Sequence, residues 1–340
     1  MAAPGPVLTP LELTRRRRAW AGWARLGRLE RGGLALLALT TAVAVLAPLL
    51  APYSPVAAVH AEPFARPGAH GILGSDELPR DIFSRVLYGV RASWLSALAV
   101  IASGVLIGGL IGTVAGVAGG WPDAALMRVT DLFLALPAPV LAIAVIAALG
   151  PSLPHTLVAL GIVWWPWYAR IVRAEVRAQS VRSHVDAARL AGVGRTRLAL
   201  RHLLPGAFPA VLVTASLDVG SLVLVLAGLS FIGLGSPPPA PELGAMAASG
   251  MPYLLGHPWI PLAPATAVFL LAFAANLAGD GLRDLLEDHR RRSCATSPAA
   301  PGDPVGRRRP ARLGLHVDPT ASARTRRRNV TTGLPGRHGP

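Results

Sequence analysis

The chain has 340 residues, of which 52% are hydrophobic and 15% charged, and its formal net charge is +15 at pH 7. This composition is too apolar for a soluble enzyme and is typical of a chain that crosses a bilayer several times. The sequence contains no Lys, which excludes a P-loop lysine and a lysine Schiff base, and its one cysteine, Cys294, excludes an internal disulfide framework.

Six apolar stretches are long enough to cross a bilayer, since about 18 residues suffice for one helical span. In chain order they cover residues 34–52, 92–118, 129–149, 156–173, 209–235 and 259–279. The fourth is the least apolar, because Trp and Tyr residues typical of the headgroup level fill its end. The first is longer than a signal-peptide core, so we expect an uncleaved anchor. The pattern predicts an all-α polytopic membrane protein.

The arginines flank the predicted spans mostly on one side. They gather in the basic N-terminal segment 1–33, in the segment 170–205 and after residue 282, whereas the loop 53–91 has few. By the positive-inside rule, we expect both termini in the cytoplasm and this loop outside it. These positions account for most of the net charge, so we expect contact with membrane lipid and no binding of nucleic acid. Residues 286–340 lack apolar periodicity and are predicted to form a disordered, basic cytoplasmic tail.

The second predicted span carries a row of glycines at a spacing of four residues. They are Gly104, Gly108, Gly112, Gly116 and Gly120. Small residues at this spacing stack on one side of a helix and let another helix approach closely. We therefore expect a helix-packing face, which by itself identifies no substrate.

The segment of residues 170–205 is much longer than a turn between two spans requires. Its apolar residues favour a helix over 171–190, and Gly192 then interrupts the pattern. A second short helix is expected over 195–204, ended by Pro205.

Asp186, Ala187 and Ala188 stand just before this break. Two small residues beside a carboxylate can fit a short helix tightly into a groove on another protein. The alternative, from the residues alone, is a basic pair of helices that lies on lipid headgroups.

The series Asp186-Ala187-Ala188, Gly192 and His202-Leu203-Leu204-Pro205 resembles the EAA loop in the membrane subunits of binding-protein-dependent ABC importers. Three further motifs are similar to the dipeptide/oligopeptide/nickel branch of that family, in its DppC/OppC-like subunit. They lie at residues 73–91, which begin with LGSD, at 228–238, which begin with GLSFIGLG, and at 279–284, which read GDGLRD. The four motifs stand in the family's order, and the resemblance covers residues 30–288.

The resemblance implies a type I ABC importer membrane domain with six transmembrane helices, whose core lies at residues 92–285. Such a permease is no enzyme and needs no cofactor or metal. It implies a second permease subunit, a paralogue, together with two separate ATPase subunits and an extracytoplasmic substrate-binding protein. It also implies a bacterial inner-membrane location and the import of short peptides, with nickel or another small solute as the alternative cargo.

Within the EAA loop, the resemblance implies docking into a cleft on an ATPase subunit. Asp186 would offer charge to basic groups there, and Ala187 and Ala188 would allow close approach. Gly192 would permit the turn between the two short helices. The loop is completed by His202 and Pro205.

An intramembrane protease is the main alternative class, because Ser230 lies in an apolar stretch and His155, His202 and His257 could supply a base. The predicted spans place these histidines at the membrane faces, away from Ser230. We expect the Ser230 hydroxyl to bond its own helix backbone. No span carries an Asp, Glu or His pair at i, i+4, so the sequence predicts no metal site.

Two carboxylates within the spans are candidate functional groups, because ionisable side chains in a membrane are costly. Asp131 stands three residues after Arg128 at the cytoplasmic end of the third span, which predicts an ion pair between them. Asp218 lies well inside the fifth span without a partner in its own helix. We expect it to face the translocation pathway or to pair with a partner subunit.

Overall fold

The computed structural model describes residues 28–59, 62–68 and 71–295, which form helices joined by loops, with an isolated β-bridge between Ser75 and Asp81. The helices are α2 (Arg28–Leu50), α3 (Ile82–Ala118), α4 (Gly120–Ala135), α5 (Ala138–Leu149), α6 (Leu153–Ser180), α7 (Ser183–Leu190), α8 (Arg195–Leu198), the π-helical η1 (Ala199–Leu203), α9 (Leu204–Phe231), α10 (Leu243–Gly250), the short η2 (Met251–Tyr253) and α11 (Trp259–Ala295). The predicted all-α class is confirmed for these residues. Most of the predicted tail and of the basic N-terminal segment lies outside them.

Four segments of the described chain are long and apolar enough to cross a membrane. They are Arg31–Leu50 in α2, Ile82–Ala118, the continuous stretch Arg195–Phe231 that ends with α9, and Trp259–Asp284 in α11. The bent pair of α4 and α5 would be a fifth. Helix α6, which contains the fourth predicted span, is not among them. The count of six spans and the cytoplasmic location of both termini stay predictions.

The third predicted span, residues 129–149, is not one straight helix. Helices α4 and α5 meet at 87°, with a break at Leu136 and Pro137. Leu136 is extended, with ψ of 139°, because a proline disfavours helical geometry in the residue before it. Pro137 then opens α5, where a missing N–H costs nothing. The pair is therefore a broken span or a re-entrant loop.

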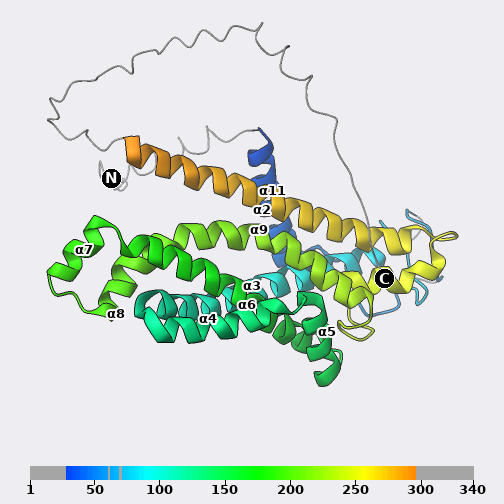
Figure 1. Ribbon diagram of the computed structural model, residues 1–340. Coiled ribbons are helices and arrows are strands. Elements are labelled where there is room, and N and C mark those ends of the chain that lie inside the picture. The colour runs from blue at the N-terminus through cyan, green and yellow to red at the C-terminus, as the bar shows by residue number, and fades with distance from the viewer. Residues whose placement is uncertain (1–27, 60–61, 69–70, 296–340) are drawn as a thin grey trace, which may run out of the picture. The chain divides into compact units, whose positions relative to one another are not determined.

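Helices α3 and α6 form the centre of the described bundle, and α2, α4, α5 and α9 pack around them (Figure 1). Large side chains are fully buried in this core, among them Val100 of α3, Tyr168 of α6 and Leu222 of α9. Helix α11 approaches α9, where a Cβ added to Gly279 would lie 2.7 Å from a methyl group of Leu217.

Four of the five glycines predicted to form a packing face lie against α6: Gly104, Gly108, Gly112 and Gly116. A Cβ at Gly108 would lie 2.4 Å from the Trp165 carbonyl oxygen, and one at Gly112 would lie 2.4 Å from that of Ala169. Because the neighbouring atoms are backbone, a side chain at either position would force the two helices apart.

The prediction for Gly120 is wrong. Helix α3 ends at Ala118, and the chain turns at Gly119, whose φ is +62°, so that Gly120 is the first residue of α4. No described atom lies within 4 Å of a Cβ built on Gly120. The chain changes direction before this residue, so its spacing no longer places it on the α3 face.

Candidate functional site

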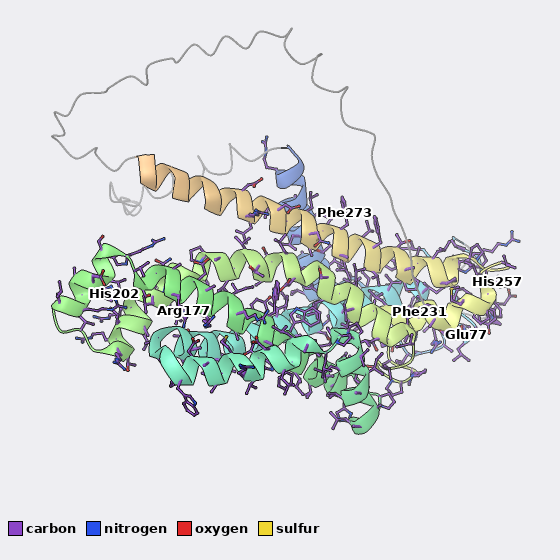
Figure 2. The ribbon with its side chains drawn as sticks, viewed as in Figure 1. Glu77, Arg177, His202, Phe231, His257 and Phe273 are labelled. Atoms are coloured by element: carbon purple, nitrogen blue, oxygen red, sulfur yellow. The ribbon has the colours of Figure 1, made fainter. Side chains whose placement is uncertain are left out.

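Residues 181–203 form a pair of short helices at one end of the bundle, which we call the α7–α8 hairpin. Figure 2 shows His202, in this hairpin, and His257, in the loop before α11, at opposite ends of the helices. Val185 of α7 and Leu198 of α8 are buried in the hydrophobic core and anchor both helices. The hairpin is thus a projection with an apolar base.

The helix expected over residues 171–190 is two helices in the structure. Helix α6 ends at Ser180 and α7 begins at Ser183. Between them Arg182 is extended, with ψ of 143°, which turns the chain out of the α6 axis. Val176 and Val185 are both buried, although nine residues of one unbroken helix would place them on opposite sides, so the spacing itself indicated the break.

Gly192 makes the turn of the hairpin. Its φ is +77°, its N–H donates to the Arg189 carbonyl at 3.0 Å, and the next N–H, of Val193, donates to the Ala188 carbonyl at 3.1 Å. These two bonds form a Schellman motif, in which glycine is favoured because the left-handed conformation strains other residues. The space around Gly192 is open among the described residues. The turn therefore depends on backbone freedom and not on the absence of a clash.

The second short helix does not end at Pro205. Residues Ala199–Leu203 form a π-helical segment that runs directly into α9. Pro205 lies in the first turn of α9, a position at which proline is well tolerated. His202 lies in the π-helical segment and is half-buried. The hairpin is therefore continuous with the helix that carries Asp218.

The outer surface of the α7–α8 hairpin combines charge, small residues and apolar side chains. Asp186 and Ala187 are exposed, and the Asp186 carboxylate accepts from Arg189 at 3.0 Å. Leu190 beside them is 90% exposed. Val181 and Leu200 of the hairpin are also largely exposed, so the hairpin presents several large apolar side chains on its surface.

Gln179 and Gly206 close the base of the hairpin, although the sequence reading named neither. The Gln179 side chain is buried and its Nε2 donates to the Gly206 carbonyl at 3.0 Å. In the sequence, the signal was a single Gln at the end of an arginine-rich helix. Once such an amide is buried, it requires a hydrogen-bond partner.

A second polar cluster joins α4 to α6 near the hairpin. The Asp123 carboxylate, only 6% exposed, accepts from Arg173 at 2.8 Å and also from Arg177. The predicted pair of Asp131 with Arg128 is wrong, because Asp131 accepts instead from Arg170 at 2.6 Å. Helix packing thus pairs both α4 carboxylates with α6.

Asp218 of α9 has a partner on another helix. The Tyr168 hydroxyl of α6 donates to its Oδ2 at 2.8 Å. Tyr168 is fully buried, whereas Asp218 is partly exposed on the surface of this chain. The contact spans 50 residues of sequence, so helical periodicity could not predict it.

Ser230 donates to the Glu242 carboxylate and not, as expected, to its own helix backbone. The second Glu242 oxygen accepts from the Ser236 backbone N–H, so this buried carboxylate holds the α9–α10 connection closed. The Ser230 hydroxyl and the Ser236 N–H therefore both bind Glu242, a contact that joins two segments of the chain.

The three candidate bases make other contacts. His155 Nδ1 lies 2.8 Å from the Gly150 carbonyl, and the His257 ring stacks on Phe64 with centroids 4.6 Å apart. His202 lies in the hairpin, away from Ser230. The described residues also contain no group of three or more His, Cys, Asp or Glu side chains that could hold a metal ion.

At the end opposite the hairpin, the motif at 73–91 forms a buried ionic network. Asp76 accepts from Arg80 Nε at 2.7 Å, and Arg85 lies 3.6 Å from the same carboxylate. Arg85 also donates to the carbonyls of Pro55 and Pro239, at 2.7 and 3.3 Å. The network ties the loop before α3 to the loop after α9.

Known proteins resemble this chain over most of its length. The family described as "Binding-protein-dependent transport system inner membrane component" matches residues 108–292. The chain is 41% identical over 252 residues to the probable D,D-dipeptide transport system permease protein DdpC of Escherichia coli strain K12, which covers 74% of this chain and 85% of that protein.

Two further relatives are similar over comparable lengths. The di/tripeptide transport system permease protein DppC of Pseudomonas aeruginosa strain UCBPP-PA14 is 39% identical, covering 75% of this chain and 86% of that protein. The nickel transport system permease protein NikC of Escherichia coli strain K12 is 38% identical, covering 76% and 94%. The family resemblance of the four motifs is thereby confirmed. The chain belongs to the binding-protein-dependent transport system inner membrane components, as a multi-pass permease subunit of the peptide/nickel branch of ABC importers.

Proposed function

We propose that this permease subunit imports short peptides and that its α7–α8 hairpin transmits the motion of separate ATPase subunits to the pathway. A paralogous second permease completes the pathway, and two ATPases bind at the hairpin end. An extracytoplasmic binding protein delivers the peptide at the other end. The chain supplies the pathway and the coupling element, and its partners supply ATP hydrolysis.

The geometry of the α7–α8 hairpin is the observation that carries this proposal. Its outer surface exposes Asp186, Ala187 and Leu190, while its base is held by Val185. The five arginines of the hairpin suit anionic lipid headgroups as well, but small residues beside an exposed Leu let a partner helix or cleft approach closely, which binding to lipid does not require. The passage of the hairpin into α9 gives a continuous path for the motion.

The peptide cargo is supported by the relatives. Two of the three described above are permeases for D,D-dipeptides and for di/tripeptides, and the third is a permease for nickel. Nickel is therefore the second candidate cargo, and an uptake experiment can compare it with peptides.

Uptake by the whole transporter, reconstituted in vesicles with its ATPases, second permease and binding protein, tests the proposal. The wild type is expected to accumulate labelled di- and tripeptides only when ATP is present. Leu190→Arg places a bulky charge on the hairpin surface, and both ATPase retention and uptake should fall at least about tenfold, equivalent to ~1.4 kcal/mol of docking energy.

Leu255→Arg is the matched control, because Leu255 is also fully exposed but lies two residues from His257, at the opposite end from the hairpin (Figure 2). It should leave ATPase retention unchanged. Wild-type uptake by Leu190→Arg would refute coupling through the hairpin. Accumulation of labelled nickel in place of peptide would identify nickel as the cargo and leave the proposal of coupling through the hairpin unchanged.

A further inference from the structure

Asp218 places a carboxylate in α9, within the stretch Arg195–Phe231 that is apolar enough to cross a membrane. Among the described residues, Asp218 accepts one hydrogen bond, from the Tyr168 hydroxyl at 2.8 Å, and forms no salt bridge. An ionisable side chain at this depth is costly unless it is paired or faces water. The neutral phenol of Tyr168 supplies a hydrogen bond but no positive charge.

Tyr168 holds one side of this carboxylate in place. Its side chain is fully buried, and its Cδ2 would lie 3.1 Å from a Cβ added to Gly104. The ring therefore packs directly against the backbone of α3 at this glycine. A ring wedged in this way keeps its hydroxyl at a fixed position beside Oδ2. None of the described residues donates to Oδ1. The second oxygen is therefore available to a group from outside the chain.

Asp218 also belongs to a polar face of α9. Thr214, Asp218 and Ser221 follow one another at i, i+4 and i+7, which places them on one side of the helix. Ser221 is exposed, and Thr214 and Asp218 are partly exposed on the surface of this chain. The Thr214 hydroxyl donates to the Ala210 carbonyl of its own helix, but hydrocarbon cannot satisfy the Asp218 carboxylate, so this face meets water or polar groups when the subunit is assembled.

We propose that Asp218 and Ser221 line the translocation pathway and that the Asp218 carboxylate binds a cationic group of the transported solute. An ammonium group of a peptide and a metal cation share this chemistry. The proposal rests on the proposed transport function and adds a residue and a charge preference to it. A single carboxylate, held by one neutral donor, attracts a cation without enclosing it, as release on the far side requires.

Thiol accessibility tests the charge and hydration of this face without any knowledge of the cargo. Ser221→Cys, made in the full transporter after Cys294→Ser removes the chain's one cysteine, places a thiol one turn from Asp218. A cationic methanethiosulfonate should modify it about tenfold faster than an anionic one, after correction for their rates with a free thiol, because a carboxylate concentrates cations in a narrow path. Adding Asp218→Asn should remove most of this preference.

Leu212→Cys is the control, since Leu212 is also exposed but lies nine residues before Ser221, on the opposite side of α9. It should react slowly with both reagents. Equal rates at the two positions, or a Ser221→Cys preference that survives Asp218→Asn, would overturn the proposal.

Uptake then identifies the cationic group. Asp218→Asn should leave binding-protein-stimulated ATP hydrolysis unchanged and lower the solute imported per ATP at least about fivefold. Asp218→Glu, which keeps the carboxylate, should import much more solute per ATP than Asp218→Asn. Tyr168→Phe should cause a smaller loss than Asp218→Asn. If only the import of a labelled tripeptide falls, the group that binds Asp218 is the peptide ammonium group. If only the import of labelled nickel falls, it is the metal cation. Import of both at wild-type efficiency by Asp218→Asn would overturn the site. A wild type that hydrolyses ATP but imports neither would instead refute the proposed cargo, and the thiol rates would still decide the site.

Discussion

Gln179 and Gly206 join the chain segments that enter and leave the α7–α8 hairpin, through a hydrogen bond of 3.0 Å from the Gln179 amide to the Gly206 carbonyl. Gln179 lies in the last turn of α6 and Gly206 in the first turn of α9, so a displacement of the hairpin acts on both helices. A Cβ on Gly206 would lie 2.7 Å from Gln179 Cδ, so a side chain at position 206 would displace the Gln179 amide from its present position.

Gln179→Leu should loosen the base of the hairpin. The change removes the amide donor and leaves the Gly206 carbonyl without this bond, at a cost of about 1–2 kcal/mol. Hydrogen exchange of the α7 and α8 amides should become faster. Ser180→Ala is the control, because the Ser180 hydroxyl bonds only the Arg177 carbonyl of its own helix. Equal exchange rates in the two variants would contradict the role given to Gln179.

Gly192→Ala should strain the turn of the hairpin by about 1–2 kcal/mol, the cost of the left-handed conformation for a residue with a Cβ. Gly194→Ala serves as its control, since Gly194 has φ of −62° and equally open surroundings. We expect Gly192→Ala to weaken ATPase binding to the membrane subunits in a pull-down at graded ATPase concentration. A binding curve like that of Gly194→Ala would show that the turn is not under this constraint.

Gly108→Ala should destabilise the contact between α3 and α6, because the added methyl group would lie 2.4 Å from the Trp165 carbonyl oxygen. Overpacking of this kind costs about 1–3 kcal/mol. The thermal midpoint of the protein in detergent should fall. Gly109→Ala, one residue along and with open space around its Cβ, should leave the midpoint unchanged or raise it, since Ala favours a helix. The reverse order of the two midpoints would refute the packing assignment.

Asp123→Asn should cost about 1–3 kcal/mol of stability, because Arg173 and Arg177 both lose a charged partner that is itself buried. Asp131→Asn should cost less than about 1 kcal/mol, because Asp131 and Arg170 are both about half exposed. Thermal unfolding of the two variants beside the wild type checks this difference. Similar midpoints for both would mean that burial of Asp123 does not set its contribution.

The family, the helical class and the position of the turn at Gly192 could all be predicted from the sequence. Apolar length, helical spacing and the conformational freedom of glycine are local properties, and they are written in consecutive residues. The four glycines that do lie against α6 could be named for the same reason. Gly120 could not be placed, because an extrapolated spacing holds only as long as the helix continues, and α3 ends at Ala118.

Partners across helices were decided by the tertiary structure alone. Asp131 pairs with Arg170 and not with the nearby Arg128, and Ser230 bonds Glu242 and not its own backbone. Asp218 meets Tyr168 across 50 residues of sequence. The sequence by itself determined which residues are apolar, small or charged and, within one unbroken helix, on which side each one lies. Which helices those sides meet depends on how the whole bundle packs, because a hydrogen bond requires its two atoms to come within about 3 Å.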